Sequence, residues 1–140
     1  MESYIKLRIC GHGLNLQEIT NQLGMTPVNA RKKGEIFIDE KYGMRVTVFQ
    51  EDFWLGGYKP RQNSKLEDEI EYFAMKLKPS ATYLKALAEK HDVRFWVSLH
   101  LEEIQANVHI SPATINALSE MGAKLDCSMM FLKDFYEGNY

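Results

Sequence analysis

The sequence predicts one α+β domain: a mainly antiparallel sheet of five to six strands, with about four helices packed largely on one face. Segments such as 3–10 alternate apolar and polar residues with a period of two, which is typical of half-buried strands. Segments such as 66–77 instead repeat apolar residues at helical spacing. The chain has 140 residues, 45% of them hydrophobic, and this length fits a single domain over 1–140.

The first quarter of the chain is expected to form a strand, a helix and a basic loop. The strand is predicted at 3–10 and ends at a Gly-His-Gly turn. In the helix that follows, Asn15 is the expected N-cap, Glu18 lies three residues on as in a capping box, and Gly24 ends the helix. Residues 28–34 then form the basic loop.

The next segment is predicted to hold two short strands and an aromatic loop. The strands are expected near 35–38 and 44–50, and residues 53–60 surround a Gly-Gly pair with aromatic side chains. This loop could lie over the polar face of the sheet. The alternative is that Trp54 anchors the core, which is favoured because tryptophan is buried on average.

Three further helices are predicted from their caps. The second helix begins at Ser64, with Glu67 completing a capping box, and the third begins at Pro79-Ser80. The fourth is capped by Ser111, with proline at its first position, and closed by Gly122. Its core side is expected to carry three apolar residues, Ile115, Leu118 and Met121.

The last strand is predicted at 124–131, where apolar and polar residues alternate again. A cap, a short helix and a closing glycine occur in both halves of the chain, at 14–24 and at 110–122. A duplicated half-domain is one interpretation of this echo. Two independent helices that both end at glycine is the other.

Residues 93–110 are predicted to form a hairpin that turns at Glu102-Glu103. Facing residues then have numbers that add to 205, and one face of the hairpin is entirely apolar. A slip of one residue would destroy this segregation, so the pattern specifies the register. The second face carries polar and aromatic residues: Arg94, Trp96, Ser98 and His100 against His109, Asn107 and Gln105.

This polar side of the sheet is the predicted partner-binding site. It is basic and aromatic although the chain has a net charge of −2, and Arg, Tyr and Trp are enriched at interface hot spots. The alternative is an ordinary solvated sheet face. The residues predicted to bind a partner are Arg8, Arg94, Trp96, His100, Asn107 and His109, beside Tyr4 and Lys6.

A family resemblance follows from the order of several segments. These are YIKLRI at 4–9, LNLQEITNQLGMTP at 14–27, RKKGE at 31–35, LEDEI at 66–70 and ISPATINALSEMGAKLD at 110–126. Together they resemble the uncharacterised bacterial domain-of-unknown-function family 4279. The resemblance implies a cytoplasmic bacterial α+β domain and supplies no catalytic residues. Small stand-alone bacterial domains are often proposed as immunity partners of toxins, which makes a toxin one candidate partner by analogy.

Composition narrows the partner classes. An isoelectric point near 6.1 argues against a dedicated nucleic-acid binder. No apolar run approaches the ~20 residues of a membrane helix, and the N-terminus does not resemble a signal peptide, so a cytoplasmic location is expected. A protein partner is expected, with a homodimer also possible, and neither nucleic acid nor membrane.

Metal and nucleophilic chemistry are not expected. In the predicted register His100 and His109 lie about 13 Å apart, too far to share a zinc ion. Cys10 and Cys127 lack metal-site spacing and are expected to be reduced core thiols. No GxSxG elbow is present. We therefore name no catalytic residue, no metal and no cofactor.

An enzyme is the less favoured alternative, and its anion site would be the Gly11-His12-Gly13 turn. This turn joins a strand to a helix, so its backbone N–H groups could hold the phosphate of a small molecule. The Walker and Rossmann glycine patterns are absent, and a tight turn is the simpler interpretation. Binding of an anionic metabolite without catalysis is a further alternative.

Overall fold

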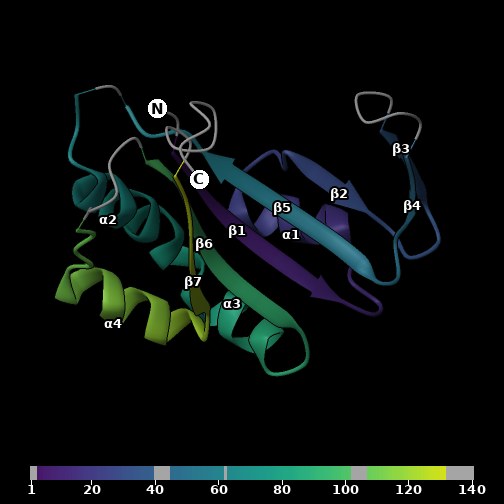
Figure 1. Cartoon of the computed structure of the whole chain (residues 1–140). Helices are drawn as coiled ribbons and strands as arrows, with labels where there is room; N and C mark the ends of the chain where they lie inside the picture. The colour runs from purple at the N-terminus through teal and green to yellow at the C-terminus, as the bar shows by residue number, and fades with distance from the viewer. Residues whose placement is uncertain (1–2, 40–44, 62, 102–106, 132–140) are drawn as a thin grey trace.

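The computed structural model describes residues 3–39, 45–61, 63–101 and 107–131 of the chain (Figure 1). Its main sheet has the strand order β2-β5-β1-β6-β7. All neighbours in it are antiparallel except β6 and β7, which are parallel. The strands are β1 (Tyr4–Gly11), β2 (Asn29–Arg31), β5 (Asp52–Tyr58), β6 (Asp92–Leu101) and β7 (Lys124–Phe131).

The remaining elements are a layer of helices and a second, two-stranded sheet. The helices are α1 (Leu16–Leu23), α2 (Leu66–Leu77), α3 (Ala81–Ala88) and α4 (Pro112–Met121), with a 3₁₀ turn at Lys78–Ser80 between α2 and α3. The second sheet pairs β3 (Ile36–Asp39) with β4 (Arg45–Val48). The α+β class and the mostly antiparallel sheet are therefore confirmed.

The core lies between one face of the sheet and the helices. Odd-numbered β1 residues such as Leu7 and even-numbered β5 residues such as Trp54 point into it, because alternate strand residues face opposite sides. The buried cluster continues with Phe95 of β6, Ile19 of α1 and Phe73 of α2. Trp54 is fully buried, and its indole N–H donates to the Thr20 hydroxyl at 3.1 Å. The expectation that Trp54 is a core residue is confirmed.

The helix ends with strong local signals were predicted correctly. The Asn15 side chain accepts a hydrogen bond from the Glu18 amide at 3.1 Å, and Gly24 ends α1 with φ 61°. The Ser111 hydroxyl accepts from the Thr114 amide, and Gly122 ends α4 with φ 65°. Glycine has no Cβ and so adopts this left-handed conformation at little steric cost, which explains why both helices end there.

The predicted 93–110 hairpin is wrong. Phe95 lies opposite Leu7 of β1 on one side and opposite Leu125 of β7 on the other, so β6 has no free edge for Ile110. Residues 107–110 form no strand. Their apolar side chains, Val108 and Ile110, pack against the core cluster instead. The proposed Glu102-Glu103 turn lies outside the described residues.

Other boundaries also differ from the prediction. Residues 53–60 are not a loop: most of them form β5 beside β1. Helix α2 begins at Leu66, and its N-cap Lys65 makes no side-chain capping bond, so Ser64 does not cap it. On α4 the buried positions are Thr114, Ala117, Leu118 and Met121, and Ile115 is 55% exposed. The predicted and the observed set of inward-facing residues on α4 both have helical spacing, so spacing alone did not distinguish them. Thr114 can be buried because its hydroxyl contacts the Ser111 hydroxyl.

Candidate functional site

One face of the sheet is turned away from the helices, and its side chains form the candidate site. We call it the polar face and define it by Tyr4, Lys6 and Arg8 of β1, Arg94 and Trp96 of β6, and Asp126 and Ser128 of β7. Arg94 is directly opposite Arg8 on β1, and Trp96 is opposite both Lys6 and Asp126. The register therefore gathers residues from three strands that are distant in sequence.

Arg94 is fixed by carboxylates on two strands. Its Nε donates to Oδ2 of Asp92 at 2.7 Å, and its Nη1 donates to Oδ2 of Asp126 at 2.9 Å. The ammonium group of Lys124 lies 3.4 Å from the other oxygen of Asp92. Burial raises the pKa of Asp92, but Arg94 and Lys124 outweigh it, so this pKa is lowered overall. The guanidinium of Arg94 is therefore already engaged in ion pairs, one of which joins β6 to β7.

Arg8 and Lys6 are bound differently. The Arg8 Nε donates to the sulfur of Cys10 at 3.1 Å, and its guanidinium lies 5.9 Å from the centroid of the Phe53 ring. The Lys6 ammonium lies 5.0 Å from the Trp96 ring centroid. Within the described parts of the chain, neither cation forms an ion pair with an acid. Among the described residues, the contacts of these two cationic groups are with aromatic rings and, for Arg8, with the sulfur of Cys10.

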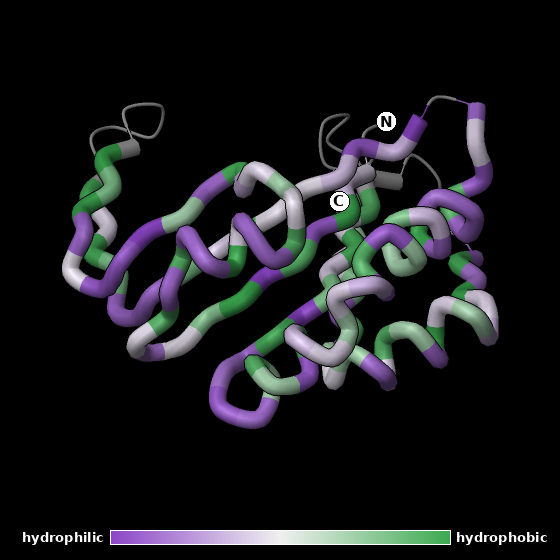
Figure 2. The backbone as a smooth tube through the Cα atoms, turned by 180° about the vertical axis from the view of Figure 1, so that it is seen from behind, coloured by the Kyte–Doolittle hydropathy of each residue, from purple (hydrophilic) through white to green (hydrophobic). Residues whose placement is uncertain are grey.

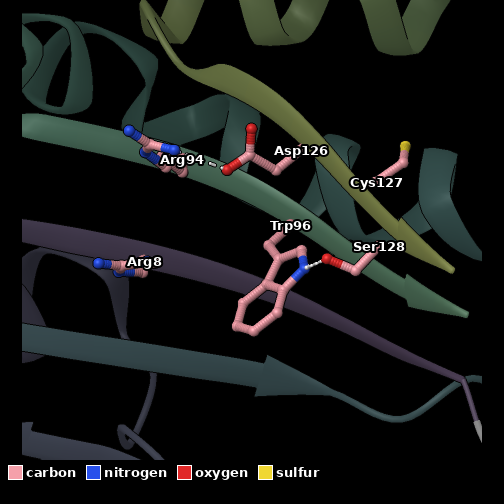
Figure 3. Close-up of a pocket in the computed structure, with 6 residues that line it drawn as sticks. All are labelled: Arg8, Arg94, Trp96, Asp126, Cys127 and Ser128. Atoms are coloured by element: carbon pink, nitrogen blue, oxygen red, sulfur yellow. Dashed lines mark hydrogen bonds and ion pairs between the residues drawn. The ribbon is translucent and has the colours of Figure 1, made fainter. Parts of the chain in front are cut away.

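A shallow hollow of about 290 Å³ opens between β1, β6 and β7 (Figure 3). Trp96 is held in it by a hydrogen bond from its indole N–H to the Ser128 hydroxyl at 2.8 Å. Figure 3 shows the indole lying across β1, and the Cys127 side chain pointing away from the others. The residues that line the hollow are Arg8, Arg94, Trp96, Asp126, Cys127 and Ser128.

The structure brings together three of the six predicted partner-binding residues, namely Arg8, Arg94 and Trp96. His100 belongs to β6 opposite Met130, and its side chain lies outside the described part. Asn107 and His109 lie in a segment that forms no strand, so their place on this face stays a prediction without a supporting contact. It rested on the hairpin that does not form. Their segment contacts the helix layer, where the Ser111 hydroxyl donates to Glu71 of α2 at 2.8 Å.

The sequence analysis did not include Asp126 and Ser128 among the residues of the site. Alternation in 124–131 placed Asp126 and Ser128 on the polar side of their strand, and that signal was correct. What it could not supply was the neighbour, because the parallel pairing of β7 with β6 joins Arg94 to a carboxylate 32 residues later. Phe53 was missed for a similar reason, since 53–60 was not recognised as a strand.

The Gly11-His12-Gly13 turn serves an internal carboxylate. The amide of Leu14, which follows the turn, donates to Asp52 at 2.9 Å. The Lys33 amide and the Lys32 ammonium bind the same carboxylate at 2.9 and 3.0 Å. The Lys33 amide above all, with Lys32 and Leu14, outweighs burial and holds the pKa of Asp52 far below its usual range. An external anion at this turn stays a prediction without a supporting contact.

A second buried carboxylate, Glu69, joins β5 to α2. It is fully buried and accepts hydrogen bonds from the Tyr58 hydroxyl at 2.6 Å and from Arg61 at 2.9 Å. The bond to Glu69, together with burial, raises the pKa of Tyr58, so this phenol keeps its proton. With both carboxylate oxygens engaged, the cluster has the character of a structural link.

The other reactive groups considered in the described residues are the two cysteines and the side chains that could bind a metal ion. Cys10 is only 2% exposed, and burial raises the pKa of its thiol, which makes it a weak nucleophile at neutral pH. Cys127 is exposed, so the expectation that both cysteines are core thiols is wrong for it. Across residues 3–39, 45–61, 63–101 and 107–131, no three His, Cys, Asp or Glu side chains are placed to hold a metal ion.

Comparison with known proteins gives one match. A family model described as "Domain of unknown function (DUF4279)" matches residues 1–132 of the 140. No curated protein and no solved structure matches the chain. Among the described helices, none is long and apolar enough to cross a membrane.

Proposed function

This chain belongs to the DUF4279 family, whose description carries no activity, and we propose that it is a non-catalytic binding module whose polar face docks an acidic surface of a protein partner. The observation that carries the proposal is the state of Arg8 and Lys6. Both are cations on a half-buried sheet face, and within the described residues both rest against rings and not against acids. A carboxylate from a partner would supply the missing counter-charge.

Arg8 is suited to be the anchor. Its one described hydrogen bond uses Nε, so the two terminal nitrogens of the guanidinium remain available as a pair of donors. Such a pair matches the two oxygens of a carboxylate and forms bonds roughly twice as strong as neutral ones. The Phe53 ring centroid, 5.9 Å from the guanidinium, adds a cation–π contact that favours this position of the side chain. Arg94 is less suited, because two carboxylates of the chain already occupy it.

Trp96 would add apolar contact beside the charge. Tryptophan and arginine are the residue types that most often dominate the energy of protein interfaces. The hydrogen bond to Ser128 holds the indole in one orientation before binding. A side chain that is already ordered loses less conformational entropy when a partner docks, which favours affinity.

Two finer parts of the proposal rest on the sequence, the family resemblance and analogy, and not on the geometry of the polar face. One is that the protein works in a bacterial cytoplasm. The other is that its partner is a toxin, so that the chain acts as an immunity protein. In that form, the toxin would present an acidic surface, and the polar face would bind it without any chemical step.

Affinity capture with matched variants tests the proposal. Wild type, Arg8→Ala and a control, Lys76→Ala on α2, would each be immobilised and exposed to native lysate. We expect wild type and the control to retain a common protein, and Arg8→Ala to lose it. Higher salt should release it, because salt screens exposed charge pairs. Equal retention by Arg8→Ala would contradict the use of this face.

The hollow favours a second candidate, binding of a small anionic metabolite. Its volume of about 290 Å³ is at the lower end of ligand sites, and two arginines line it. Residues 53–60 do not cover this hollow as a loop, since most of them form β5. Calorimetric titration with citrate and inorganic phosphate separates the candidates. Saturable binding that Arg8→Ala abolishes would support the small anionic metabolite. The absence of any heat of binding would reject that candidate and retain the protein partner.

A further inference from the structure

The two-stranded sheet of β3 and β4 stands apart from the main sheet, and we call it the arm. Its pairs, such as Ile36 with Val48, have numbers that add to 84, as do Ala30 and Trp54 in the main sheet. The arm is therefore the outer half of one long hairpin whose base is β2 and β5. Strand β1 ends its pairing at Gly11 opposite Asp52, so the arm extends beyond it (Figure 1).

One side of the arm is made only of branched aliphatic side chains. Ile36 is opposite Val48, and Ile38 is opposite Val46, so all four share one face of the pair. They are 62%, 46%, 52% and 58% exposed, in that order. We call these four residues the arm face. Figure 2, which views the molecule from behind, shows hydrophobic residues on both arm strands at the outer end of the hairpin.

Such a face is unusual for a hairpin that packs on nothing. Exposed strands normally carry charges or proline that prevent association with other chains. A two-stranded hairpin alone is marginally stable at best, and it needs more strands or a packed face. Within the described residues, no helix covers the arm face, as the exposed fractions show. A surface from another molecule would therefore stabilise it.

We propose that the arm face packs against the arm face of a second copy of this chain. An apolar strip needs an apolar strip of the same size, and an identical face meets that requirement across a two-fold axis. The other exposed large apolar residues of the described structure lie outside the arm face, singly or in pairs, and Phe37 is on the opposite side of β3. They are Val28, Phe37, Tyr72, Ile115, Leu125 and Met129.

Charge and area both bear on this contact. The whole chain carries a net charge of only −2, so two copies repel weakly. Four half-exposed side chains on each arm amount to a few hundred Å², below the ~800 Å² that each partner contributes to a standard stable interface. The expected product is a weak, reversible dimer that forms as concentration rises.

Sedimentation equilibrium over a concentration series tests the proposal. For wild type, the average mass should rise from 16.2 kDa toward twice that value. The pair Ile38→Thr with Val46→Thr keeps the branched shape and strand propensity but makes the face polar, and it should remain monomeric. Ile115→Thr, on α4 and 55% exposed, is the control and should behave like wild type. Monomeric wild type, or a dimer that survives in the paired variant, would overturn the proposal.

Cross-linking locates the contact independently of affinity. In a Cys127→Ser background, where the remaining Cys10 is buried, Ile38→Cys should form disulfide dimers under mild oxidant faster than Ile115→Cys. The two positions are similarly exposed, at 52% and 55%, so accessibility alone predicts equal rates. Equal rates would therefore count against arm pairing. Neither test depends on Arg8 or the polar face. The arm proposal can therefore fail without contradicting the proposed function, and the reverse is also true.

Discussion

Arg8 and Arg94 lie directly opposite each other on β1 and β6, yet only Arg94 is bound by carboxylates in the described structure. Like charges directly opposite in an antiparallel pair destabilise a sheet. Asp92 and Asp126 relieve this repulsion from the Arg94 side. Among the described residues, Arg8 contacts a ring and a thiol and no carboxylate, so we expect its charge to contribute little to the fold.

The first prediction concerns the stability of Arg8→Leu. Leucine keeps an apolar body against Phe53 and removes the repulsion with Arg94, so the free energy of unfolding should stay the same or rise by about 0.2–1 kcal/mol. Urea denaturation followed by circular dichroism measures it. A marked loss of stability would show that Arg8 serves the fold, and it would remove the reason for assigning it to binding.

The second prediction concerns binding. Asp126→Asn should strengthen the binding of an acidic ligand, whereas the loss of Arg8 should weaken it. Asparagine cannot neutralise Arg94, so the polar face becomes more positive while its shape is kept. Affinity for a hexaglutamate peptide should increase by about 0.2–1 kcal/mol, the range of one exposed charge pair. Calorimetric titration at low salt gives the value. Weaker binding than wild type would mean that Asp126 itself contacts the ligand.

The third prediction tests the internal role of Asp52. Asp52→Asn removes the charge that binds two amides and Lys32, so the free energy of unfolding should fall by about 1.5–3 kcal/mol, typical of hydrogen bonds to charged groups. Asp68→Asn, on the exposed first turn of α2, is the matched control and should change little. Chemical denaturation at neutral pH compares them.

The pH dependence of the same variant has a definite sign. The folded pKa of Asp52 is depressed, and an unfolded aspartate titrates near ~3.9. Its stabilisation is thus complete above about pH 4–5 and is lost as the pH falls toward the folded pKa. Asp52→Asn should lose stability less steeply than wild type below about pH 4. Parallel acid titrations of the two proteins would show that Asp52 does not carry this effect.

The fourth prediction separates the two tryptophans. Trp54 is fully buried and Trp96 lies on the polar face, so Trp96→Phe should leave a folded protein with blue-shifted emission and weak quenching by acrylamide. The loss of the bond to Ser128 should reduce stability by only about 1 kcal/mol. If Trp96→Phe instead unfolds the protein, the assignment of this face as a surface is wrong.

The contrast between α4 and β6 shows what the sequence could and could not predict. Ser111 and Gly122 act on their own neighbours, so capping patterns located both ends of α4. The partners of β6 depend on residues far along the chain. Apolar residues at 95, 97 and 99 and at 108 and 110 are all turned inward, but the first set lies in the sheet and the second beside the helices. Periodicity reports burial and not the identity of the neighbour, so the two sets looked like one hairpin.

The same distinction explains the candidate site. Arg8, Arg94 and Trp96 were found because alternation within one strand fixes the face of each residue. Asp126 and Ser128 complete the site only through the β6–β7 pairing, and Asp52 meets Leu14 across 38 residues. Contacts of that separation depend on topology. Strand β5 was also hidden, because its two glycines suggested a loop, whereas Gly56 is needed where a Cβ would lie 2.7 Å from the Trp54 ring.

The most direct test of the central claim is an ¹H–¹⁵N NMR titration of the protein with hexaglutamate at low salt, with hexalysine as the control. Binding at the polar face predicts saturable shifts at the amides of Lys6, Arg8 and Trp96 and at the Trp96 indole N–H. Arg8→Leu and added salt should both abolish them, and hexalysine should cause none. Shifts that fall elsewhere, or that persist unchanged in Arg8→Leu, would contradict the account.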